Sequence, residues 1–126
     1  MAKILIVDDS QTDIQYIKSV LQPLGHTLAV AMDGEEGEQM IRAEPYDLII
    51  LDVVMPKKNG FQLCREIKKD DALKHIPVLI LTSKDQDSDK LWGEKQGADA
   101  FLKKTGDNME LLIAIRKLLG RREAKG

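Results

Sequence analysis

The stretch Ile4–Asp13, ILIVDDSQTD, places two adjacent carboxylates directly after four apolar residues. The run ILIV has no apolar–polar alternation, which is typical of a parallel strand covered on both faces. The segment SQTD then predicts a helix start with Ser10 as N-cap and Asp13 as the third helical residue. Two carboxylates about 4 Å apart repel by ~4 kcal/mol at an effective dielectric constant of about 20. The pair Asp8 and Asp9 therefore needs a partner that offsets this repulsion.

Further apolar runs repeat this alternation of strand and helix along the chain. They occupy residues 28–31, 48–51 and 76–81, with a weaker run at 100–102. Segments of helical length lie between them, and a last helix is expected over residues 108–119. The alternation predicts an α/β fold, in which a doubly wound, five-stranded parallel sheet carries helices on both faces.

Length and composition favour one small domain. The 126 residues carry a formal net charge of -2, so we expect no nucleic-acid partner, which would normally require a basic domain. A single cysteine, Cys64, favours a reducing cytoplasmic location. The apolar runs are far shorter than the ~20 residues of a membrane-spanning helix. We expect a domain over residues 1–120, a solvated tail over 121–126, and no attached output module.

Polar residues gather at the expected carboxyl ends of the strands, where open parallel sheets bind ligands. These residues are Asp8 and Asp9 after the first strand, Asp52 after the third, Thr82 and Ser83 at the fourth, and Lys103 at the fifth. Taken singly, each has an ordinary structural explanation as a helix cap, a turn residue or a surface lysine. Their convergence on several strand ends favours a functional site.

Four segments together resemble the receiver domains of two-component response regulators, which have the CheY-like fold. The segments are ILIVDD at 4–9, LIILDVVMPKKNGF at 48–61, PVLILTS at 77–83 and GADAFLKK at 97–104. The resemblance covers residues 3 to about 119. It implies the strand order 2-1-3-4-5 and five surrounding helices.

The resemblance also implies a chemistry for the acids. Asp52 would be the nucleophile that accepts a phosphoryl group from a sensor histidine kinase or a histidine phosphotransfer domain. Mg²⁺ would be bound directly by Asp9, Asp52 and the backbone carbonyl of Val54, while Asp8 would act through a bound water. Two adjacent acids at the sheet edge are then explained by the metal.

The remaining strand-end residues receive roles in the same way. Lys103 would neutralise the phosphoryl oxygens as a compact point charge, and Thr82 would donate a hydrogen bond to one of them. Ser83 is small and would leave the donor a clear approach. The family usually follows its lysine with a proline and a cis peptide bond. Here Lys104 follows Lys103, and we expect a trans bond because cis costs ~2.5–4 kcal/mol without proline.

Two further pairs would control lifetime and switching. Val54 and Lys84 occupy the positions that tune hydrolysis of the acyl phosphate in this family, and Val54 offers no hydrogen bond to the attacking water. Thr82 and Phe101 match the threonine and aromatic residue of the family's conformational switch. Phosphorylation would shift a pre-existing equilibrium between two conformations through them.

The output face implied by the resemblance comprises the fourth helix, the fifth strand and the fifth helix. Ile113 is expected to be exposed on the last helix, and Trp92 on the fourth either packs against the neighbouring helix or anchors a partner. The run TSKDQDSDKLWGEKQGA at 82–98 is similar to small regulators of type IV pilus twitching and phototaxis systems. We therefore expect a signalling protein in motility control, not an enzyme beyond slow self-dephosphorylation.

Several alternatives stay open on the sequence. Within the family, the chain could be a phosphotransfer shuttle, a phosphate sink, or a pseudo-receiver scaffold that takes no phosphate. A flavodoxin-like module shares the fold, but the acidic loop DDSQTD would repel a flavin phosphate. A dehalogenase-type phosphatase would need a second acid two residues after Asp52, where Val54 stands.

Overall fold

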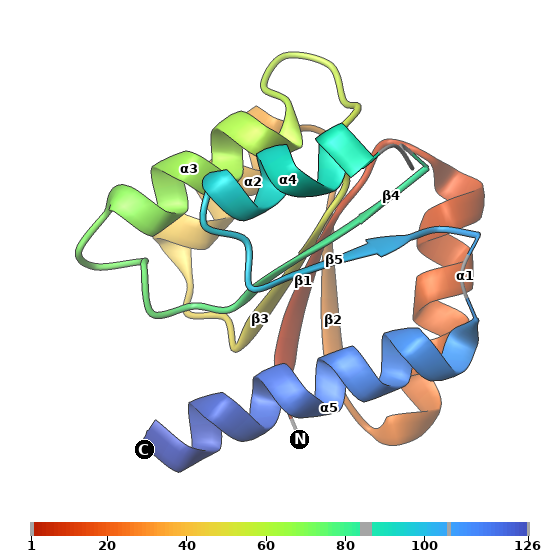
Figure 1. Cartoon of the computed structure of the whole chain (residues 1–126). Helices are drawn as coiled ribbons and strands as arrows, with labels where there is room; N and C mark the ends of the chain where they lie inside the picture. The colour runs from red at the N-terminus through yellow and green to blue at the C-terminus, as the bar shows by residue number, and fades with distance from the viewer. Residues whose placement is uncertain (1, 84–86, 106, 126) are drawn as a thin grey trace.

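The computed structural model describes residues 2–83, 87–105 and 107–125, with side chains described as far as Gly120. Five strands form one parallel sheet in the order β2-β1-β3-β4-β5 (Figure 1). Their bounds are β1 (Lys3–Val7), β2 (Thr27–Ala31), β3 (Leu48–Leu51), β4 (Val78–Thr82) and β5 (Ala100–Lys103). The fold class and strand order expected from the sequence are confirmed.

In the described part of the chain, five helices and one short 3-10 helix connect and cover the strands. They are α1 (Gln11–Leu21), η1 (Gln22–Leu24), α2 (Gly34–Ala43), α3 (Gly60–Lys69), α4 (Asp87–Lys95) and α5 (Asn108–Lys125). Figure 1 shows α1 and α5 on one face of the sheet and α2, α3 and α4 on the other. The expected end of the last helix at Leu119 is wrong: α5 continues to Lys125. Residues 121–125 are good helix formers, and Gly120 alone does not stop a helix.

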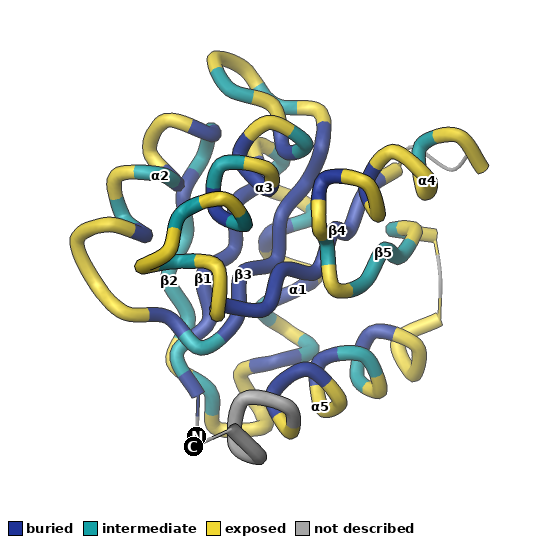
Figure 2. Tube along the Cα trace, turned by 60° about the vertical axis from the view of Figure 1, so that its left-hand side comes forward, coloured by how far each residue is buried: buried dark blue, intermediate teal, exposed yellow. Residues whose placement is uncertain are grey.

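Each face of the sheet carries its own apolar core. Ile4 and Ile6 belong to the cluster under α1 and α5, whereas Leu5 and Val7 belong to the cluster under α2 and α3. Neighbouring residues of a strand point to opposite faces, so β1 supplies both clusters. All four side chains are fully buried, which explains the unbroken apolar run. Figure 2 shows the buried strands at the centre and the exposed outer sides of the helices.

Helix starts are fixed by side-chain caps at the carboxyl edge of the sheet. The Ser10 side chain accepts a hydrogen bond from the backbone N–H of Asp13, as predicted. Asp33 and Asn59 cap α2 and α3 in the same manner. The chain thus turns from strand to helix at one edge, and the polar residues that follow β1 and β3 share that edge. In the described part of the chain, no helix is long and apolar enough to cross a membrane.

Candidate functional site

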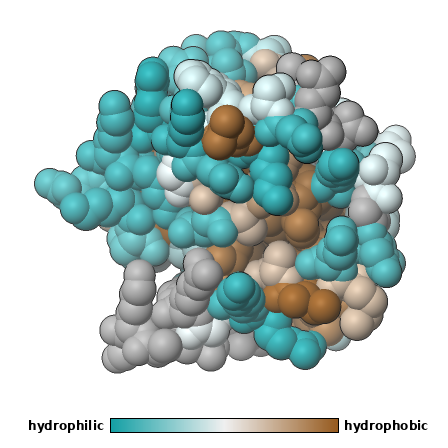
Figure 3. All heavy atoms as spheres, in the orientation of Figure 1, coloured by the Kyte–Doolittle hydropathy of each residue, from teal (hydrophilic) through white to brown (hydrophobic). Residues whose placement is uncertain are grey.

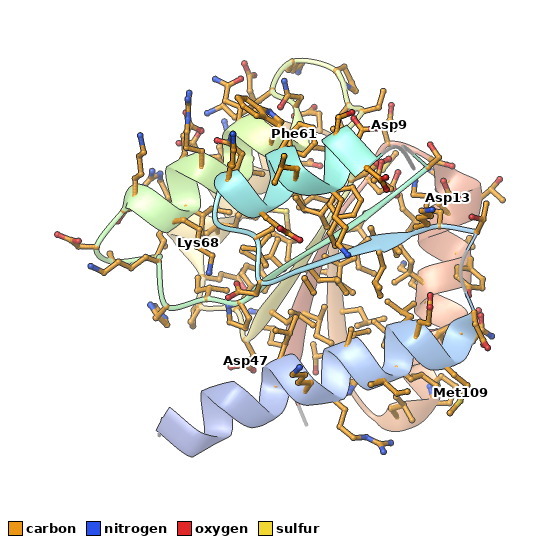
Figure 4. The ribbon with its side chains drawn as sticks, in the orientation of Figure 1. Asp9, Asp13, Asp47, Phe61, Lys68 and Met109 are labelled. Atoms are coloured by element: carbon orange, nitrogen blue, oxygen red, sulfur yellow. The ribbon has the colours of Figure 1, made fainter. Side chains whose placement is uncertain are left out.

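Three carboxylates meet at the carboxyl edge of the sheet. Val7 pairs with Leu51 in the register of β1 and β3, so Asp8 and Asp52 leave the sheet side by side. One oxygen atom each from Asp8, Asp9 and Asp52 lies within 4.8 Å of the others. Asp8 and Asp52 are 2% and 6% exposed, while Asp9 is open to solvent. Figure 4 shows Asp9 at the end of the sheet where α1 begins.

The two buried carboxylates are held by backbone amides. The N–H of Ser10 donates to Asp8 Oδ1 at 2.9 Å, and the N–H of Val53 donates to Asp52 Oδ1 at 2.7 Å. Burial raises the pKa of the Asp8 carboxyl, and its hydrogen bonds to Lys104 and Ser10 offset that rise only in part. Each carboxylate keeps its second oxygen directed toward the site.

One ammonium group joins these acids, and it belongs to Lys104. Its Nζ lies 2.8 Å from Asp8 Oδ2, 2.6 Å from Asp13 Oδ2 and 2.9 Å from Asp52 Oδ2. Burial lowers the pKa of Lys104, but the hydrogen bonds to the three carboxylates outweigh burial, so this pKa stands above its ordinary value. Lys104 is therefore charged and half-enclosed at the centre of the site.

The prediction that Lys103 lies in the site is wrong, because the next residue, Lys104, occupies that place. Lys103 pairs with Thr82 at the last register position of β5, and its side chain is exposed. The N–H of Lys104 donates to the carbonyl of Thr82 at 2.8 Å, which holds the chain as it leaves the sheet. Consecutive side chains of a strand point in opposite directions, so a shift of one residue reverses the outcome. The bond between Lys103 and Lys104 is trans, and Thr105 follows the lysine of the site.

Asp13 is a site residue that the sequence analysis missed. It was assigned only to the first turn of the helix, where its N–H does bond to the Ser10 side chain. Its carboxylate instead reaches Lys104 across the rim of the sheet. Its position could have indicated a role in the site, because it lies four residues after Asp9, at the helix end nearest the strand-end acids.

The remaining candidate residues surround the acids at different depths. Thr82 is fully buried at the end of β4, whereas Ser83 beside it is exposed. Val54, two residues after Asp52, is 53% exposed. Lys84 lies outside the described residues. The metal-binding role of the Val54 carbonyl and the tuning roles stay predictions.

Phe101, the expected switch aromatic, packs against α4. A Cβ atom added at Gly93 would lie 2.8 Å from Cδ2 of Phe101 and 3.3 Å from Cδ1 of Ile80. The absent side chain at Gly93 therefore lets α4 approach the Phe101 ring closely. The Phe101 side chain is partly buried in this arrangement.

The surface over α4, β5 and α5 carries exposed apolar side chains. Ile113 is 60% exposed, as expected, and Trp92 is 49% exposed. The Trp92 ring also meets the Phe61 ring edge-on, with centroids 6.5 Å apart, so it both packs against α3 and faces solvent. Figure 3 shows apolar atoms gathered between β5 and α5 on this side of the molecule.

The arrangement fits a hard divalent cation. Among the described residues, the ammonium of Lys104 contacts the carboxylates of Asp8, Asp13 and Asp52. The carboxylates of Asp8, Asp9 and Asp52 converge, and Mg²⁺ prefers such oxygen donors over nitrogen or sulfur. A bound cation would offset the excess negative charge.

Comparisons with known proteins agree with this geometry. The response regulator receiver domain family matches residues 4–116 of the chain. Protein PilH of Pseudomonas aeruginosa is 44% identical over 94% of this chain and 98% of its own length. The receiver domain of the Francisella response regulator 1452 has a TM-score of 0.88 and 33% identity, covering 97% of this chain and 99% of its own. The Mn(2+)-bound form of response regulator Rcp1 has a TM-score of 0.78 and 27% identity, covering 95% and 91%.

Proposed function

Because the chain belongs to the response regulator receiver domain family, we propose that it is switched by phosphorylation of Asp52. The donor would be a phosphohistidine on a sensor histidine kinase or a histidine phosphotransfer domain. The observation that supports this most strongly is the position of Asp52: it is a buried member of the carboxylate cluster, and its Oδ2 lies 2.9 Å from the ammonium of Lys104.

The proposed reaction is an in-line displacement at phosphorus. An oxygen of Asp52 forms the new bond to phosphorus, the bond from phosphorus to the donor imidazole breaks, and that nitrogen keeps the electron pair. Asp8, Asp9 and Asp52 would hold Mg²⁺, which neutralises phosphoryl oxygens when bound. Lys104 supplies the second positive charge, and the hydroxyl of Thr82 at the end of β4 is the hydrogen-bond donor for a phosphoryl oxygen.

The signal would leave through the face formed by α4, β5 and α5. Movement of Thr82 toward the phosphoryl group would draw Phe101 inward, and the contact of Phe101 with Gly93 would pass this movement to α4. The similarity to PilH supports a role in pilus-driven motility. The protein would act in the cytoplasm by contact with a target protein, as a signalling molecule whose only turnover is slow self-dephosphorylation.

The test is uptake of a phosphoryl group from acetyl phosphate, measured by intact mass with and without Mg²⁺. We expect the parent protein to gain one phosphoryl group only when Mg²⁺ is present. The Asp52→Asn variant should gain none, whereas Asp71→Asn, which alters an acid that is 94% exposed on the surface, should match the parent. Equal uptake by parent and Asp52→Asn, or none by the parent, would refute the proposal and favour a scaffold.

The lifetime of the phosphorylated state tests the role of Val54. Its exposed side chain cannot position a water molecule, so the Val54→Asn variant should lose its phosphoryl group faster than the parent. Decay of the phosphorylated mass after removal of the donor measures both rates. An unchanged or longer lifetime in the variant would remove Val54 from the hydrolysis step.

A further inference from the structure

The ammonium of Lys104 and a metal ion would compete for the carboxylates of Asp8 and Asp52. Lys104 Nζ contacts Asp8 Oδ2 and Asp52 Oδ2, and both residues belong to the cluster of three converging carboxylates. An ammonium has three N–H donors, and the third is directed to Asp13 Oδ2 at 2.6 Å. Among the described residues, Asp13 is the one partner of Lys104 outside that cluster.

The local hydrogen bonding frees the Asp13 carboxylate for this contact. In a capping box, the acid at the third helical position accepts from the N–H of the N-cap residue. Here the N–H of Ser10 donates to Asp8 Oδ1 instead, at 2.9 Å. Asp13 is thus held by its backbone to the Ser10 side chain, while its side chain turns to Lys104. Figure 4 shows Asp13 on α1 at the same end of the sheet as Asp9.

We propose that Asp13 is a positioning residue that holds Lys104 beside the metal site, so that a divalent cation gains the oxygens of Asp8 and Asp52. The inference rests on the proposed function, since it assumes that Mg²⁺ binds at the three carboxylates. Without Asp13, the described acceptors left to the ammonium are Asp8 and Asp52 themselves. The lysine would then occupy those oxygens more fully and oppose metal binding.

The test is the dissociation constant for Mg²⁺, measured by titration calorimetry on the whole chain without a phosphodonor. We expect Asp13→Asn to bind Mg²⁺ about threefold to fivefold more weakly than the parent. Glu35→Gln is the matched charge control, because Glu35 is exposed in the first turn of α2 at the same edge and pairs with no described cation. This control should weaken binding by less than about 1.5-fold. Asp13→Glu, which keeps the carboxylate, should restore most of the affinity.

Repeating the test in the Lys104→Met variant distinguishes a positioning role of Asp13 from a direct effect of its charge on the ion. In Lys104→Met there is no ammonium to hold, so adding Asp13→Asn should weaken Mg²⁺ binding only as much as Glu35→Gln does. A loss as large as in the parent background would show that Asp13 acts directly on the ion, which overturns the inference. Equal effects of Asp13→Asn and Glu35→Gln in the parent background would also overturn it while leaving the phosphorylation proposal intact. A parent protein that binds no Mg²⁺ would refute the metal site and the inference together.

Discussion

The two edges of the sheet treat their charged residues in opposite ways. At the edge where the strands begin, Asp47 accepts a hydrogen bond from the N–H of Lys3 at 2.8 Å. Asp99 accepts from the N–H of Val78 at 2.8 Å and pairs with the ammonium of Lys68 at 2.8 Å. Each acid there has its own donor. Figure 4 shows Asp47 at this edge, far from Asp9 and Asp13.

At the edge where the strands end, three carboxylates share the ammonium of Lys104, and Asp9 adds a further negative charge beside Asp8 and Asp52. The balanced pairs of the first edge fasten strand starts to neighbouring segments. The excess negative charge of the second edge has no such use, because like charges at close range lower stability. The two edges therefore differ in charge balance, and the excess negative charge lies at the edge that carries the candidate site.

Removing the ammonium of Lys104, at the edge where the strands end, should give the largest change in stability. Lys104→Met leaves Asp8 and Asp52 buried without their ammonium partner, so the free energy of unfolding should fall by about 3 kcal/mol without Mg²⁺. Lys103→Met is the matched control, and it should change stability by less than about 0.5 kcal/mol because its side chain is exposed. Urea unfolding of both variants measures these losses. A larger loss in Lys103→Met than in Lys104→Met would show that Lys103 is the lysine of the site.

Crowding behind Asp52 should give a smaller effect. A Cβ atom at Gly60 would lie 2.0 Å from the backbone oxygen of Asp52, so Gly60→Ala must displace α3 or the acid. We expect a loss of about 1–3 kcal/mol in the free energy of unfolding, together with slower phosphorylation. Gly120→Ala in α5 meets no atom within 4 Å and should stabilise the protein by about 0.5–1 kcal/mol. Equal stability of the two variants would show that α3 does not fix the position of Asp52.

At the edge where the strands begin, we expect only a small change in stability, and it should depend on pH. His26 Nδ1 accepts a hydrogen bond from the N–H of Ala2 at 3.2 Å, and burial lowers the pKa of His26. A base with a lowered pKa stabilises the fold above its unfolded value of 6.5 and loses that contribution as the pH falls. The melting temperature should therefore drop slightly from about pH 7.5 to about pH 5.5. His26→Gln should lessen that drop; an identical drop in both proteins would assign it to other groups.

The sequence predicts the fold well, because the unbroken apolar run of β1 reflects real burial on both faces. It also predicts that Asp8, Asp9 and Asp52 converge, since parallel strands deliver their carboxyl ends to one edge. The lysine was misplaced by one residue because the point at which β5 leaves the sheet depends on its pairing with Thr82.

Asp13 was missed for a different reason. Its sequence position satisfies a helix-start pattern completely, and the pattern gives no indication that Asp8 takes the Ser10 amide and releases the Asp13 carboxylate. Tertiary contacts decide such cases.

The most direct test of the carboxylate cluster is the free energy of unfolding with and without Mg²⁺, measured for the parent and for Asp9→Asn. If the excess carboxylates exist to bind the ion, the parent should gain stability with Mg²⁺, reaching about 2.7 kcal/mol at one hundred times its dissociation constant. Asp9→Asn should start more stable, because one repelling charge is gone, and should gain little from Mg²⁺. Equal gains in both proteins, or none in the parent, would contradict the account.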